Sequence, residues 1–322
     1  MSLFPSFEEA EDKPALAQRL APKLHTLAEQ GVYFGASSWK YDGWLGSIYS
    51  PGRYTTRGKF SQSKFERECL AEYAATFPTV CGDFAFYQFP TRDYWHRLFG
   101  ETPDAFTFGL KVPEDITVLR WPGHARYGKR AGRPNEHFLD ADVFRRLFLD
   151  ALAPYRTRVG PLIFEFGTFA KQDFAEAATF FDHLGAFLGA LPAGWRYAVE
   201  IRNAEYLLPA YFDVLGSRNV AHVFNAWTRM PALGDQVRLA DAFTADFTVV
   251  RALLAKGRSY EQAVKAFQPY RAIREPNEDA RAGMGQVARR AAKKKEPAFL
   301  YVNNRLEGFS PGTIEAVADG LS

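Results

Sequence analysis

The sequence predicts one (β/α)8 barrel of the TIM type, an α/β fold in which eight parallel strands close into a ring. Short runs rich in β-branched and aromatic residues alternate with longer stretches of helical period, and there are eight such runs. The chain has 322 residues, of which 47% are apolar, so it can bury the core of one large domain. We therefore expect a single domain, with an N-terminal extension and extra helix over residues 1–31 and the barrel over residues 32–322.

The expected strands are the short apolar runs, which cover residues 33–37, 79–87, 106–111, 161–166, 196–202, 220–225, 247–251 and 298–303. Segments with the hydrophobic period of a helix precede or follow most of these runs, and they cover residues 15–30, 64–77, 143–152, 174–191 and 313–321. In the stretch 64–77, for example, Phe65, Leu70, Tyr73 and Phe77 share one face, as a helix packed on a sheet requires.

Three connections, over residues 38–63, 112–142 and 252–297, are longer than a tight turn needs. Each follows a strand, so in a barrel all three emerge on the face where enzymes of this fold place their sites. We expect them to form walls or lids of a pocket. Plain loop extension is the alternative for any one of them.

Composition limits the classes of protein to consider. The 40 basic and 37 acidic residues give a net charge of only +3, too small for a dedicated nucleic-acid binder that uses its whole surface. Cys69 and Cys81 form neither a disulfide framework nor a metal-ligand spacing. The acidic residues of the first segment do not fit a signal peptide, and no stretch reaches about 18 apolar residues. We expect a cytoplasmic protein with no membrane contact.

Charged or amide residues recur at the carboxyl ends of the expected strands. They are Lys111, Glu165, Glu200, Arg202, Asn225, Arg251, Asn303 and Asn304. A charge that faces the barrel interior costs several kcal/mol unless it is paired or hydrogen-bonded. The repeated occurrence of charged residues at the carboxyl ends of the strands therefore indicates a shared polar pocket.

The alternation of a strand puts Glu200 and Arg202 on the same inner face. Neighbouring strands lie ~4.8 Å apart, so Glu165 could approach Glu200. Two close carboxyl groups separate their pKa values, which would provide one acid and one base. The alternative is that Glu200 only pairs with Arg202, Lys111 or Arg251 and fills the barrel mouth.

Several segments together resemble the YecE-like family, domain of unknown function 72. They are GASSWKYDGW at 35–44, AFYQFP at 85–90, FTFGLK at 106–111, YAVEIR at 197–202, the pair 250–251, and YVNN at 301–304 with Gly308. They occur in the family's order from about Val32 to the end. The resemblance implies a TIM-type barrel whose polar cleft has no established substrate, and it matches Trp39, Tyr41, Trp44, Tyr87, Lys111, Glu200, Arg202, Arg251, Asn303 and Asn304 to family motif positions.

The chain also departs from the family pattern. Cys81 and Asp83 stand where the family usually has Glu and Asn, and residues 165–167 replace a Gln followed by two prolines. Ala252 and Leu253 replace a short apolar residue, His and Gly after the strand-seven arginine. The chain is therefore similar to a divergent branch, in which a family activity can be altered.

Our leading hypothesis is a metal-independent acid-base enzyme, isomerase-like or hydrolase-like, that acts on a small polar, anionic or sugar-like substrate without a cofactor. Catalysis would use Glu200, Glu165 and Lys111. Substrate binding would use the aromatic rings of Trp39, Tyr41, Trp44 and Tyr87 and the polar groups of Arg202, Asn225, Arg251, Asn303 and Asn304. Burial in the core is the alternative for the aromatic residues.

Three other hypotheses stay open. No paired-histidine motif supports a metal, although Glu165, Glu200 and Asn303 could hold a divalent ion. Glu165 and Glu200 could cleave glycosides if a groove separates them. A barrel without turnover could bind nucleic acid or a protein through the basic loop 120–133 and the basic helix 281–295, provided that both lie on one surface. The sequence predicts no oligomeric state.

Overall fold

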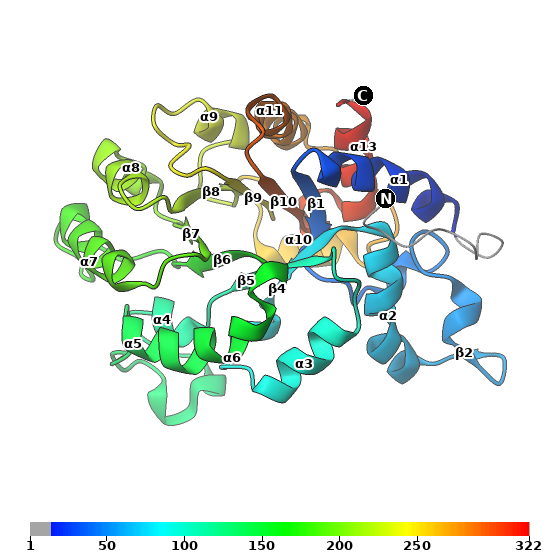
Figure 1. Cartoon of the computed structure of the whole chain (residues 1–322), viewed down its shortest axis with the longest axis horizontal. Coiled ribbons are helices and arrows are strands. Elements are labelled where there is room, and N and C mark those ends of the chain that lie inside the picture. The colour runs from blue at the N-terminus through cyan, green and yellow to red at the C-terminus, as the bar shows by residue number, and fades with distance from the viewer. Residues whose placement is uncertain (1–13, 322) are drawn as a thin grey trace.

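The computed structural model describes residues 14–321, and its centre is a closed barrel of eight parallel strands surrounded by helices (Figure 1). The order around the barrel is β1-β10-β9-β8-β7-β6-β5-β4, so strands that follow one another in the chain lie side by side. The strands are β1 (Val32–Ala36), β4 (Thr79–Gly82), β5 (Thr107–Lys111), β6 (Val159–Glu165), β7 (Arg196–Glu200), β8 (Ala221–Ala226), β9 (Thr248–Ala252) and β10 (Ala298–Val302). The predicted TIM-type fold is confirmed.

All eight strands coincide with predicted runs, and the largest error concerns β4. The apolar run 79–87 predicts a strand up to Tyr87, whereas β4 ends at Gly82 and a 3-10 turn, η4 (Asp83–Ala85), follows. The chain bends so tightly that a Cβ on Gly82 would lie 2.8 Å from the Phe84 ring. Apolar character alone cannot reveal this bend, because a buried turn and a buried strand have the same composition.

The helices cover the outside of the barrel (Figure 1). They are α1 (Ala15–Glu29), α2 (Gln62–Thr76), α3 (Arg92–Gly100), α4 (Glu114–Thr117), α5 (Ala141–Phe144), α6 (Asp150–Leu152), α7 (Ala177–Ala190), α8 (Pro209–Gly216), α9 (Leu233–Val237), α10 (Tyr260–Phe267), α11 (Glu278–Lys294), α12 (Asn304–Glu307) and α13 (Ser310–Asp319). The extra N-terminal helix is confirmed as α1, which packs against β1, α2 and α13. Residues 1–13 of the predicted extension lie outside the described part.

Some helices differ from the prediction. The stretch 143–152 is helical but contains a π-helical segment, η6 (Arg145–Leu149), between α5 and α6. Helices α3 and α10 were not predicted, although each has a capping residue. Thr91 accepts a hydrogen bond from the Tyr94 amide, and Ser259 forms a capping box with Gln262. A short antiparallel hairpin, β2 (Thr55–Thr56) and β3 (Lys59–Phe60), stands apart from the barrel.

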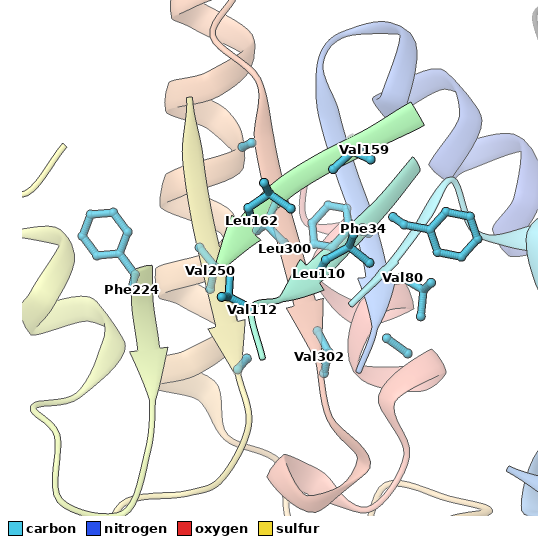
Figure 2. Packing of buried hydrophobic residues seen from close by; sticks show 14 of the residues in the cluster. Phe34, Val80, Leu110, Val112, Val159, Leu162, Phe224, Val250, Leu300 and Val302 are labelled. Carbon is cyan, nitrogen blue, oxygen red and sulfur yellow. The ribbon is translucent and has the colours of Figure 1, made fainter. Parts of the chain in front are cut away.

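Two apolar layers hold the barrel together. Outward-facing strand residues such as Phe34, Leu110 and Val250 pack beneath the helices (Figure 2). Inward-facing residues fill the lumen below the carboxyl ends of the strands, and they are Cys81, Ile163, Ala198, Ala221, Val223, Phe247, Val249, Phe299 and Tyr301. Because these residues occupy the interior, any ligand must bind above them, at the carboxyl ends.

The connection after β9 forms an apolar roof near that end of the barrel. Leu253, Leu254, Ala263, Phe267 and Tyr270 pack together, and the rings of Tyr41 and Trp227 lie against them. This arrangement agrees with the prediction that the long connection 252–297 forms a wall over the strand ends. None of the helices within residues 14–321 combines the length and apolarity needed to cross a bilayer.

Candidate functional site

A cavity of about 300 Å3 opens at the carboxyl ends of three neighbouring strands, β4, β1 and β10. Both polar and aromatic side chains line it. Its lining consists of Ser37, Ser38, Trp39, Lys40, Tyr41, Gly82, Asp83, Phe84, Tyr94, Asn303 and Arg305. We call this cavity the mouth pocket.

Close packing of β1 on β4 brings the two sides of the mouth pocket together. A Cβ on Gly35 would lie 2.1 Å from the carbonyl oxygen of Thr79, so a side chain at this position would push the strands apart. The Tyr73 hydroxyl joins the same two strands, since it donates to the Thr79 carbonyl at 2.9 Å and accepts from the Ala36 amide at 2.8 Å. Ser37 and Asp83 follow directly after these strands and therefore face the same cavity.

Lys111 connects the mouth pocket with the interior of the barrel. Its ammonium group lies 2.8 Å from the Asp83 carboxylate and 3.1 Å from the Glu165 carboxylate. The same group lies 3.6 Å from the centre of the Phe86 ring, a cation–π contact. Lys111 is almost fully buried, whereas the Asp83 side chain is 53% exposed, so Asp83 presents this pair to the pocket.

Two arginines join the carboxylates of Glu165 and Glu200, which are register partners on β6 and β7. The Arg202 guanidinium lies 3.0 Å from Glu165 and 3.2 Å from Glu200. Arg251 reaches across the barrel from β9, and its Nη1 donates to Glu165 at 2.5 Å and also to Glu200. The predicted approach of the two carboxylates is therefore present, and it is bridged by guanidinium groups.

Together with Asp83 and Lys111, these residues form a network of three carboxylates and three cations, which we call the charge network. Burial alone would raise the pKa of Glu165, but the positive charges of Arg202, Lys111 and Arg251 outweigh it and hold the pKa well below its usual range. Glu165 therefore stays ionised. This does not support the expectation that Glu165 and Glu200 divide into an acid and a base.

Glu200 is enclosed completely, with no exposed surface. Its Oε1 accepts from Arg202 and its Oε2 accepts from Arg251, so neither oxygen is available to a ligand while the charge network is intact. Asn225 is equally buried, and its amide nitrogen donates to the Ile201 carbonyl at 3.0 Å. The contacts of Glu200 thus match the alternative in which it pairs with Arg202 and Arg251 and fills the barrel mouth.

The four predicted aromatic binding residues are in three different environments. Trp39 and Tyr41 line the mouth pocket. Trp44 is in the core, with its ring 6.0 Å from that of Tyr49, and does not line the pocket. Tyr87 is 48% exposed and lies under the Arg126 guanidinium, 4.5 Å away, outside the pocket lining. Burial reduces exposure of the Tyr41 hydroxyl to water and raises its pKa to about 12, so it stays a hydrogen-bond donor.

The two predicted asparagines differ in the same way. Asn303 lines the pocket, and its Oδ1 accepts from the Arg305 amide at 2.9 Å, which caps the start of α12. Asn304 turns away into the core, where its Oδ1 accepts from both the amide and the hydroxyl of Ser310. Asn304 therefore joins α12 to α13 and does not reach the pocket.

The serines and most of the charged residues of the lining are absent from the predicted site, namely Ser37, Ser38, Lys40, Asp83 and Arg305. Asp83 meets the criterion that selected the others, since it follows a strand directly. It was overlooked because the strand was expected to continue to Tyr87. Lys40 lies in the loop after β1 and Arg305 in the short helix α12, and only the folded chain reveals that both reach the pocket.

No group of three His, Cys, Asp or Glu side chains within residues 14–321 is arranged to hold a metal ion. Glu165 and Glu200, which could have held one, bind guanidinium groups instead. His222 packs against the rings of Tyr211 and Phe212 on α8, away from the pocket. Its Nδ1 lies 3.2 Å from the Tyr211 hydroxyl, and burial lowers its pKa to about 3.

The two basic segments lie on different sides of the barrel (Figure 1). Helix α11 packs against α9, α13 and β10, whereas the loop 120–133 follows α4. Some of their cations are already paired. Arg130 lies 3.2 Å from Asp115, and Arg281 lies 2.9 Å from Glu307. The condition for a joint nucleic-acid surface, that both segments share one face, is not met.

Comparison with known proteins gives a family match and structural neighbours. The family model described as "Protein of unknown function DUF72" matches residues 33–322. A DUF72 family protein of Thermotoga maritima is 18% identical, with a TM-score of 0.60 over 90% of this chain and 98% of that one. A DUF72 family protein of Enterococcus faecalis is 16% identical, with a TM-score of 0.58 over 90% and 94%. A search of curated proteins gave no match. At these identities the structural likeness concerns the fold.

Proposed function

The chain belongs to the DUF72 family of proteins of unknown function, and we propose that it is an acid-base enzyme that acts on a small polar ligand in the mouth pocket. The observation that carries this proposal is the position of Asp83. It is the one carboxylate of the charge network that also lines the pocket, and more than half of its side chain is exposed. A proton-transfer group must reach its ligand, and Asp83 meets this requirement.

In this proposal Asp83 accepts a proton from the ligand and returns it, and Lys111 supports the reaction from behind. The Lys111 ammonium is 2.8 Å from Asp83 and is anchored on its other side by Glu165. This ion pair limits the movement of the Asp83 side chain. Glu165 and Glu200 then have a positioning role, because they hold the cations of the network in place.

The remaining lining groups support binding of a hydroxylated ligand. Asn303 is fixed by its cap on α12, so its amide has a defined orientation towards the pocket. The Tyr41 hydroxyl offers a donor, and the Trp39 ring offers an apolar wall on which a sugar ring could stack. A cavity of about 300 Å3 is at the lower end of the range for small-molecule sites.

The geometry favours this function over glycoside cleavage by Glu165 and Glu200. Both of these carboxylates bind Arg251 directly, and Glu200 has no exposed surface. A glycosidase needs its two carboxyl groups on either side of the scissile bond, with room for the sugar between them. Here a guanidinium group occupies that space.

The test is a search for proton transfer with the folded full-length chain. A metabolite extract is incubated with the protein in D2O and followed by mass spectrometry. We expect the wild type to deuterate or convert at least one metabolite and Asp83→Asn to lose this activity. Asp93→Asn, which changes an exposed aspartate of α3, is the matched control and should behave as the wild type. If no metabolite changes, or if Asp83→Asn is fully active, the proposal is wrong.

A further inference from the structure

Lys40 and Arg305 differ from the other cations near the barrel mouth. Lys111, Arg202 and Arg251 each lie within 4.0 Å of a carboxylate. Lys40 and Arg305 also line the mouth pocket, yet neither has a carboxylate within that distance among residues 14–321. Lys40 follows β1, and Arg305 follows the neighbouring strand β10. Their positive charges are therefore available to a ligand.

The charge of the pocket indicates the charge of its ligand. Asp83, the carboxylate of the lining, is paired with Lys111, so Lys40 and Arg305 leave an excess of two positive charges. A carboxylate ligand would supply one negative charge. A phosphate monoester carries about 1.5 to 2 negative charges at pH 7 and three acceptor oxygens, which matches the excess more closely.

An aromatic ring lies near each of the two cationic side chains. The Arg305 guanidinium lies 4.5 Å from the centre of the Tyr260 ring, and its backbone amide donates to Asn303. The Lys40 ammonium lies 5.9 Å from the centre of the Trp39 ring. An arginine that is supported by an aromatic face and lacks a carboxylate is suited to bind phosphate oxygens in a bidentate way.

The pocket also offers groups that suit hydroxyls. The Ser37 hydroxyl is buried and has no hydrogen-bond partner within the described residues. The Tyr41 hydroxyl and the Asn303 amide line the same space. A buried polar group without a partner is costly, so a ligand hydroxyl at Ser37 would gain a favourable contact.

Building on the proposed function, we infer that the ligand is a phosphate monoester of a small sugar or polyol. Lys40 and Arg305 bind the phosphate, and the hydroxylated carbon chain extends towards Asp83. The inference names the substrate class, whereas the proposed function concerns the reaction at Asp83. The two can therefore fail separately.

The test is calorimetric titration at low salt with three pairs of compounds, namely ribose 5-phosphate and ribose, glucose 6-phosphate and glucose, and glycerol 3-phosphate and glycerol. Inorganic phosphate and gluconate are titrated as well. We expect at least one phosphorylated compound to bind about tenfold or more tightly than its parent, inorganic phosphate and gluconate.

Two charge-neutralising variants locate the binding site. Lys40→Gln and Arg305→Gln should each weaken the tightest phosphorylated ligand by about tenfold. The controls Lys59→Gln and Arg146→Gln remove the same charges from exposed positions outside the pocket and should bind as the wild type does. Three outcomes would overturn the inference. The phosphorylated compounds could bind no more tightly than their parents, none of the six compounds could bind, or all four variants could bind with equal affinity.

The outcomes also separate the two proposals. If the deuterium experiment identifies a substrate that lacks phosphate, the substrate class is wrong and the role of Asp83 stands. If a sugar phosphate binds at Lys40 and Arg305 but no metabolite is ever converted, the substrate class stands and the enzymatic proposal fails.

Discussion

Asp83 and Lys111 form an ion pair of 2.8 Å at the ends of the neighbouring strands β4 and β5. The aspartate faces the mouth pocket, and the lysine belongs to the buried charge network. The pair therefore links the mouth pocket, which ligands can enter, with the buried charge network, which they cannot reach. This link separates the residues that can contact a ligand from those that hold the mouth in shape.

A first prediction concerns Glu200, which we regard as structural. Glu200→Gln removes one of the two carboxylates that Arg202 and Arg251 share, and leaves buried positive charge uncompensated. Breaking such a buried network lowers the free energy of unfolding by about 3 to 5 kcal/mol. Urea unfolding measures the loss. The exposed Glu176→Gln is the control, with an expected change within ~0.5 kcal/mol, and equal stability of both variants would contradict the structural role.

A second prediction separates two aromatic residues that the sequence could not distinguish. Trp44 is fully buried among Tyr49, Tyr73 and Phe77, so Trp44→Ala should lower the free energy of unfolding by about 3 to 5 kcal/mol. Tyr87 is half exposed, so Tyr87→Ala should cost less than ~1 kcal/mol. Thermal and urea unfolding compare the two variants directly. A Trp44→Ala protein as stable as Tyr87→Ala would refute the core assignment.

A third prediction follows from His222. Burial lowers its pKa in the folded chain to about 3, from 6.5 for an ordinary histidine. Between these values the unfolded chain binds a proton that the folded chain does not, so the free energy of unfolding falls as the pH falls below 6.5. The slope approaches ~1.4 kcal/mol per pH unit.

His222→Phe removes this contribution to the pH dependence. Burial also lowers the pKa of His25, to about 4, but His25 is present in both proteins and affects them equally. Between pH 7 and pH 5, the wild type should lose about 2 kcal/mol more than the variant. Urea unfolding at both pH values measures the difference. Identical pH dependence of the two proteins would show that His222 is protonated in the fold.

A fourth prediction concerns polyanions. The basic loop 120–133 and helix α11 lie on different sides of the barrel, and Arg130 and Arg281 are paired internally. We expect weak retention on heparin that disappears near physiological salt. The variant with Arg126, Lys129, Arg130 and Arg133 all changed to Ala should elute close to the wild type. Strong retention with a steep salt dependence, lost in this variant, would instead favour the binding alternative.

The charge network was largely predictable from the sequence. Lys111, Glu165, Glu200, Arg202 and Arg251 each stand at the end of an apolar run, and the period of two along a strand determines which face they share. In a closed parallel barrel all carboxyl ends meet at one side, so the fold class alone brings these residues together. Their roles as catalytic or structural groups do not follow from that placement.

What the sequence by itself determined is the order of strands and helices, and hence the barrel and the end at which charges gather, because hydrophobic period is a local property of the chain. Only the tertiary structure decided which of these groups a ligand can reach. Exposure depends on contacts between distant segments, as when Arg251 crosses the barrel to enclose Glu200 while the bend after Gly82 leaves Asp83 open. Pairing partners and turns of this kind are set by packing in space, which no local pattern of residues encodes.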